Sequence, residues 1–187
     1  MSEFTKVEID KIYEEIELQW EYHLVSRSVF FSGFGENDFK FESPTFYKNK
    51  GAYFCVTLPE ERTGIMNRTL KDVGAWLNQN YIIRLWGILD GNGIITVGKN
   101  ESNPYTKILS LLRHNVGAHS PGYRNPNRSE SKKAAKLICQ YLDKTFIPNS
   151  ANFFNLSIDT VIEVLKMRCI ELVRSLEGKE KPDRRRI

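Results

Sequence analysis

Cysteine and histidine are scarce in this sequence of 187 residues, which contains three of each. Cys55, Cys139 and Cys169 are odd in number, far apart and not spaced as metal ligands, so we expect reduced thiols and no zinc site. A phosphate-binding glycine loop and a serine-nucleophile motif are also missing from the sequence. We therefore expect a protein that works without a metal or another cofactor.

Long apolar runs are absent as well. None approaches the roughly 20 residues that a membrane span needs, and the N-terminus, MSEFTKVEID, does not resemble a signal peptide. The net charge of +4 permits contact with phosphate backbones but does not require it. With 41% hydrophobic and 27% charged residues, the composition is that of an ordinary globular protein. These features predict a cytoplasmic protein with no membrane partner.

Apolar residues recur at steps of three and four positions, which predicts amphipathic helices. The first helix is expected over about residues 9–24, before Gly33 and Gly35, and the second over about 70–89. Asn103 and Pro104 form a favourable helix start for a third helix that runs towards His119. Further helices are expected from Ser129 and Ser131, which open the fourth helix, to Leu142, and from Ser157 to Leu176, before Gly178. The predicted fold is mainly α, an antiparallel helical bundle.

Residues 36–66 do not follow this pattern. Aromatic side chains are scattered there among Pro44, Gly51 and Pro59, and residues 51–58 are compatible with a short strand or with another helix. We expect one helical domain over residues 1–178, in which 36–66 is an insertion. Residues 179–187 are expected to form a basic, flexible tail, since Arg184, Arg185 and Arg186 follow Pro182.

Polar residues are concentrated where the third helix gives way to a loop, in the segment LLRHNVGAHSPGYRN. Arg113 is followed by His114 and Asn115, and then by His119, which lies between small residues. The spacing alone decides nothing, because twelve arginines and three histidines would give about 0.6 such matches by chance. The position at a helix end, next to a turn-rich polar loop, makes this segment the candidate site.

RHNVGAH resembles the active segment of the HEPN superfamily, all-helical domains of which many are ribonucleases. That segment is an arginine, four to six residues and a histidine, usually with a polar residue after the arginine. The similarity is sharp over residues 105–128. It implies a prokaryotic HEPN ribonuclease, a toxin or antiviral defence effector, that forms a homodimer and is held in check by an antitoxin or another regulator.

The chemistry of the two residues agrees with that implication. Histidine, whose ordinary pKa is about 6.5, suits removal of the proton from a ribose 2′-OH. Arginine, always charged and fork-shaped, suits stabilisation of the phosphate. Residues six apart in a straight helix are turned by about 120° and separated by about 9 Å. Arg113 and His119 therefore need a helix break near Gly117, or two copies of the motif facing each other.

Other candidate residues surround this pair. Asn115 shares a helix face with His119, and His114 is either a catalytic helper or a surface residue. Tyr123, Arg124 and Arg128 are candidate RNA contacts, although a solvated loop has the same composition.

Each assignment has an alternative. Arg113 and His119 also suit a helix C-terminus whose cations complement the helix dipole. His23 is expected to be structural, and Arg84 to form a surface ion pair rather than to face the site. For the whole protein, the alternative function is a HEPN-like module that binds RNA, a nucleotide or a protein and cuts nothing.

Overall fold

The computed structural model describes the backbone of residues 2–32, 39–47, 50–58, 63–95, 103–117, 129–146 and 161–182, and the side chains of 2–27, 74–95, 103–114, 131–146 and 161–182. Within these residues, helices dominate and one β-hairpin interrupts them, which confirms the expected mainly α fold. The elements are α1 (Lys6–Ser32), β1 (Phe39–Tyr47), β2 (Lys50–Leu58), α2 (Thr63–Gly91), α3 (Pro104–Gly117), α4 (Ser129–Tyr141) and α5 (Glu163–Arg174).

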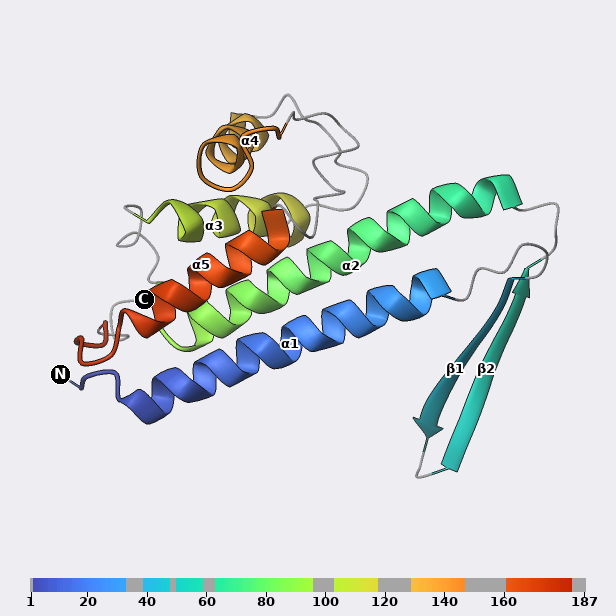
Figure 1. The fold of residues 1–187 in the computed structure, drawn as a ribbon, viewed down its shortest axis with the longest axis horizontal. Helices are drawn as coiled ribbons and strands as arrows, with labels where there is room; N and C mark the ends of the chain where they lie inside the picture. Colours follow the sequence, from blue (N-terminus) through green and yellow to red (C-terminus); the bar gives the residue numbers. More distant parts are fainter. Residues whose placement is uncertain are drawn as a thin grey trace.

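Two long helices form the base of the bundle. α1 and α2 run antiparallel and side by side, and α3 and α5 pack at the end of this pair that holds the N-terminus (Figure 1). α4 packs on α3 and is seen nearly end-on, so it crosses α3 rather than running alongside it. The β-hairpin lies at the opposite end of α1 and α2. One half of the α1–α2 pair is therefore covered by the other helices, and the other half extends beyond them.

Every helix contributes a fully buried aliphatic side chain to one core. Ile16, Leu85, Leu109, Ile138 and Leu165, one from each helix, are at most 1% exposed. Burying a side chain of this size stabilises a fold by about 1.5–3 kcal/mol. The core therefore ties α3, α4 and α5 to the α1–α2 pair.

The expected apolar face of α1 is confirmed only over its first half. Ile9, Ile12 and Trp20 are buried, but Leu24, the last residue of the expected stripe, is 41% exposed. The reason lies in the lengths, because α1 has 27 residues and α5, which packs on it, has 12. Beyond Trp20 and His23, α5 no longer covers the face of α1 that carries Leu24.

The start of one helix and a turn beyond another follow from particular residues, while α5 ends at Arg174, before the expected end at Leu176. The side-chain oxygen of Asn103 accepts hydrogen bonds from the backbone N–H of Tyr105 at 2.9 Å and of Thr106 at 3.2 Å, as expected of an N-cap. Gly178 has φ of +72°, a conformation that favours glycine, and its N–H donates to the carbonyl of Phe4 at 2.9 Å. The expected start of the last helix at Ser157 lies outside the described residues.

The region 36–66 contains a strand pair, so the strand alternative is confirmed for residues 51–58. β1 precedes β2, and the antiparallel register runs from Phe39 opposite Leu58 to Tyr47 opposite Lys50. β1 was not expected, because Pro44 interrupts it in the sequence. In a two-stranded hairpin both strands are edges, where a residue without an N–H donor is tolerated.

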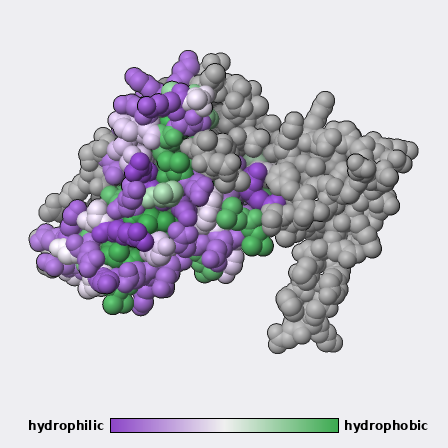
Figure 2. All heavy atoms as spheres, in the orientation of Figure 1, coloured by the Kyte–Doolittle hydropathy of each residue, from purple (hydrophilic) through white to green (hydrophobic). Residues whose placement is uncertain are grey.

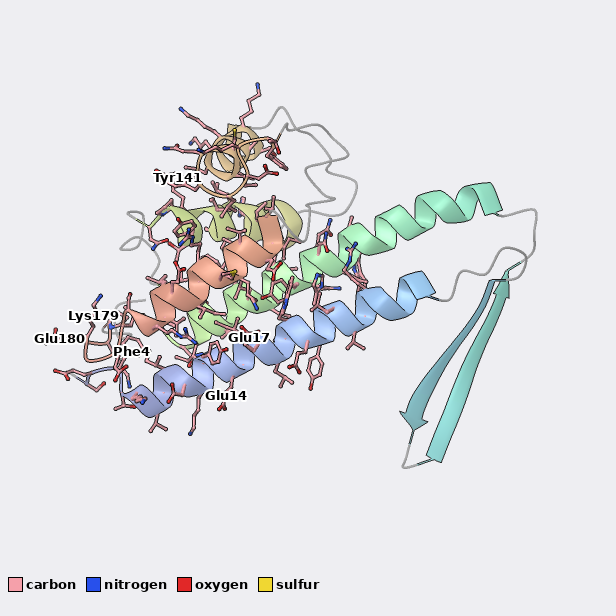
Figure 3. All side chains as sticks on the ribbon, viewed as in Figure 1. Phe4, Glu14, Glu17, Tyr141, Lys179 and Glu180 are labelled. Carbon is pink, nitrogen blue, oxygen red and sulfur yellow. The ribbon has the colours of Figure 1, made fainter. Side chains whose placement is uncertain are left out.

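The segment before α1 meets the segment after α5. The N–H of Phe4 donates to the carbonyl of Lys179 at 2.9 Å, Glu3 and Glu180 form an isolated bridge, and Lys181 pairs with Glu8. Figure 3 shows Phe4, Lys179 and Glu180 together at this point. The segment expected to be a tail therefore begins with backbone contacts, and its residues 183–187 lie outside the described part. Among the described helices, none is long and apolar enough to cross a membrane.

Candidate functional site

The packing of α3 determines which residues of the motif face outward. Ile108, Leu109 and Leu112 are completely buried, whereas Arg113 and His114 in the last turns are exposed. Because successive residues turn by about 100°, Arg113 lies at the edge of the buried stripe, one turn beyond Leu109. His114 lies on the far side of the helix from Leu109.

Arg113 contacts the neighbouring helix through an aromatic ring. Its guanidinium carbon is 5.2 Å from the centroid of the Trp86 ring, and Trp86 is half-buried on α2. Such a cation–π contact is worth about 0.5–1 kcal/mol at an exposed site. A guanidinium held by its face keeps its N–H donors at its edges, where an anionic oxygen can approach. The contact therefore limits the positions of Arg113 without using up its donors.

Trp86 is a functional candidate that the sequence analysis missed. It lies one position after Leu85, outside the apolar stripe of α2, so the helical periodicity gave no reason to select it. The sequence does contain one signal for this residue, an aromatic side chain next to the buried stripe of a helix. Such a ring is partly exposed, and its face can contact a cationic side chain.

The other motif residues are placed only in part. Asn115 belongs to the backbone of α3, but its side chain is not among those described. His119, Tyr123, Arg124 and Arg128 lie outside the described residues, as does the chain after Gly117, where a helix break was expected. The structure therefore brings Arg113 and His114 to one helix end and leaves their relation to His119 a prediction.

Arg84 does not face Arg113. It lies with Glu15, Gln19 and Asn80 along a surface groove of about 610 Å³ between α1 and α2. Arg84 and Trp86 are two residues apart and hence on opposite sides of α2. An ion pair to Arg84, the expected arrangement, is not found among the described residues.

His23 is buried among aromatic rings, as expected of a structural residue. Its ring stacks on that of Tyr81 at 5.1 Å between centroids and lies 5.3 Å from that of Trp20. Burial, and secondarily the charge of Arg27, lower the pKa of His23 to about 4. The imidazole is therefore neutral at pH 7 and has no access to a substrate.

Two further buried groups, both on α5, also have structural roles. The ammonium of Lys166 bonds both carboxylate oxygens of Glu17, at 3.0 and 2.9 Å, and lies 5.1 Å from the centroid of the Trp20 ring. Burial raises the pKa of the Cys169 thiol to about 12, which makes it unreactive. Within the described ranges, no group of three or more His, Cys, Asp or Glu residues could hold a metal ion.

No family model, curated protein or solved structure matches this chain. Membership of the HEPN superfamily therefore stays a prediction, carried by the residues of the motif and by the helical fold.

Proposed function

We propose that this protein is a metal-independent endoribonuclease of the HEPN type. The observation that carries the proposal is Arg113, exposed at the end of α3 and held over Trp86, six residues before His119. In the reaction, His119 takes the proton of a ribose 2′-OH, and the 2′-oxygen attacks the adjacent phosphorus. Arg113 binds the phosphate oxygens and stabilises their charge.

The 5′-oxygen then leaves and takes up a proton, a role that we assign to the exposed imidazole of His114. The products are a 2′,3′-cyclic phosphate and a 5′-hydroxyl end. DNA lacks the 2′-OH and is not cleaved. Asn115 supports His119, while Tyr123, Arg124 and Arg128 hold the RNA.

In this proposal the active form is a homodimer, with two copies of the motif sharing one cleft. The motif carries this part of the proposal, because Tyr22 and Val25, 56% and 59% exposed, lie on the side of α1 that faces away from its buried residues. We expect a dimer in sedimentation at micromolar concentration; a monomer that nevertheless cleaves RNA would contradict the shared cleft.

The biological role follows from the resemblance. The enzyme would act in the cytoplasm as a toxin or defence effector and would be restrained by an antitoxin or another regulator. The alternative is a HEPN-like module that binds RNA, a nucleotide or a protein without cutting.

One experiment separates these functions. The purified protein is incubated with mixed RNA in EDTA, in parallel with His119→Ala. Cleavage by the parent protein but not by the variant supports the ribonuclease. Activity that disappears in EDTA and returns with a divalent ion would contradict the metal-independent mechanism, and binding without cleavage would support the module.

A further inference from the structure

The positive charge of this protein is concentrated around the motif. Residues 113–136 contain six Arg and Lys against one Glu, a net charge of +5, whereas the whole chain has +4, so the remaining residues together have −1. Half of these cations are lysines of α4, which the proposed site does not use. Lys132, Lys133 and Lys136 are all exposed.

Helical geometry places these lysines on one face. Lys132, Lys136 and Gln140 follow at four-residue steps and form one row along α4. Lys133, Leu137 and Tyr141 form the adjacent row. Opposite the three lysines, Ala134, Ala135 and Ile138 are buried against the core. We call the surface of Lys132, Lys133, Lys136 and Gln140 the lysine face. Figure 2 shows that hydrophilic residues gather over α4.

The lysine face differs from an ordinary solvated helix surface in its charge pattern. α1 alternates signs along its length, as in Glu14 and Lys11, and its Glu17 is paired with Lys166. Lys132 and Lys136 instead repeat the same charge at i and i+4, which destabilises a helix by a few tenths of a kcal/mol. No described carboxylate forms a salt bridge with either of them. A bound polyanion would relieve this repulsion.

An exposed aromatic ring lies beside the lysine face, at the C-terminal end of α4, about a quarter turn around the helix from Lys133 and towards α3. Tyr141 is 40% exposed, and its ring meets that of Tyr105 edge-on, with 6.2 Å between centroids. The guanidinium of Arg168 lies 5.7 Å from the centroid of the Tyr105 ring. Figure 3 shows Tyr141 at the side of α4 that faces α3. Lysines that follow a backbone, together with an exposed aromatic ring for a base, are the combination that single-stranded nucleic acid requires.

We propose that the lysine face binds the phosphate backbone of single-stranded RNA and that Tyr141 stacks on one of its bases. This inference rests on the proposed function, because it takes RNA as the substrate, and it adds a binding surface beyond the motif. From Lys132 to Tyr141 the helix rises about 14 Å. A surface of that length suits a site at the short end of the roughly 4–16 nucleotides that single-strand binding sites cover. The face increases affinity for RNA and takes no part in the bond cleavage.

The test measures binding of fluorescent oligouridine to the full chain carrying His119→Ala, as a function of salt concentration. The first variant combines Lys132→Gln, Lys133→Gln and Lys136→Gln. Each lost phosphate contact lowers the salt slope of the affinity by about 0.7, so we expect a decrease of about 2. The control variant combines Lys6→Gln, Lys11→Gln and Lys179→Gln, which removes the same charge from exposed positions on other elements. Its slope should stay that of the parent.

Tyr141 is tested separately. Tyr141→Ala should weaken binding about fivefold or more, without changing the salt slope, because it removes stacking rather than a charge. Tyr141→Phe keeps the ring and should keep the affinity. Equal melting temperatures of the two variants exclude a folding defect as the cause.

Three results would overturn the proposal: an unchanged slope in the α4 variant, an equal decrease in the control, or binding of polyglutamate as tight as that of oligouridine, which would indicate an acidic protein partner.

Different results would refute the proposed function. If the lysine face binds RNA but the parent protein cleaves none, the enzyme is refuted and the surface stands. If the parent cleaves, the α4 variant should raise KM and leave kcat unchanged.

Discussion

The guanidinium of Arg113 lies over the ring of Trp86, with 5.2 Å from the guanidinium carbon to the ring centroid, so a cation–π contact joins the end of α3 to α2. Arg113 is exposed and has a long side chain, which costs entropy to hold in one place. The ring of Trp86 provides part of that ordering before a substrate binds.

Trp86→Leu should therefore lower RNA cleavage by about two- to fivefold, the equivalent of losing a cation–π contact of about 0.5–1 kcal/mol. Trp86→Phe keeps a weaker aromatic face and should lie between the parent and Trp86→Leu. Trp76→Leu is the matched control, because Trp76 is a tryptophan on the same helix that is 57% exposed. Cleavage rates that fall equally at Trp76 and Trp86 would show that the contact with Arg113 is not the cause.

Substitutions of Arg113 and of His119 should affect RNA binding and RNA cleavage differently. His119→Ala is expected to abolish cleavage and leave RNA affinity nearly intact, because a neutral imidazole attracts phosphate weakly. Arg113→Ala should also weaken binding and reduce its salt slope by up to one phosphate contact. Arg113→Lys should restore cleavage only in part, since an ammonium does not span two phosphate oxygens.

Binding, cleavage and thermal unfolding measured on the same three variants check these roles. All three should unfold within about 1 kcal/mol of the parent, because the cation–π contact that Arg113→Ala removes is worth about 0.5–1 kcal/mol at an exposed site. If the residues only complement the helix dipole, stability would change while RNA behaviour stayed the same. Parental cleavage by all three variants would show that the site lies elsewhere.

The parts of the fold that could be predicted from the sequence are those in which one element alone carries the pattern. The helical period of α3 and its Asn103 cap are local features: Ile108, Leu109 and Leu112 are buried, and the cap is confirmed. The exposure of Leu24 depends on how far α5 extends along α1, which no local pattern encodes. The contact between Arg113 and Trp86 joins two helices and was equally out of reach. The pairing of Arg113 with His119 also depends on contacts that no local pattern encodes, so it stays a prediction.

His23 gives the protein a pH-dependent stability. Its pKa is about 4 in the folded chain and about 6.5 in an unfolded one. The unfolded state therefore binds the proton first, and stability is complete above pH 6.5 and decreases as the pH falls from 6.5 to 4. The loss amounts to about 3 kcal/mol at pH 4 and below.

Denaturant unfolding of the parent and of His23→Phe between pH 7.5 and pH 4 tests this. Phenylalanine keeps a ring between Trp20 and Tyr81 but does not titrate, so the variant should lose about 3 kcal/mol less than the parent over this range. The difference between the two proteins isolates His23 from carboxylates that titrate in both. Parallel curves would mean that His23 is protonated in the fold without penalty.

The hydroxyl of Tyr81 should reduce stability rather than add to it. Its oxygen and Nε2 of His23 are buried without a hydrogen-bond partner among the described residues, and Tyr81 is only 3% exposed. Folding removes water from this hydroxyl and gives no bond in return. Tyr81→Phe keeps the ring that packs on Trp20 and His23 and leaves no partner unsatisfied. It should therefore stabilise the protein by up to about 1 kcal/mol and raise the melting temperature by about 2–4 °C.

Tyr13→Phe is the control, because the Tyr13 ring packs at the edge of the same core, is only partly buried and contacts Arg174 through its face. That variant should unfold as the parent does. A second measurement places Tyr81→Phe in the His23→Phe background. If the hydroxyl and Nε2 make no bond to each other, the gain from Tyr81→Phe should be the same in both backgrounds, to within about half a kcal/mol. A loss of stability in the parent background that disappears in the His23→Phe background would instead reveal a hydrogen bond between the two residues, and the hydroxyl would then be a stabilising group of the core.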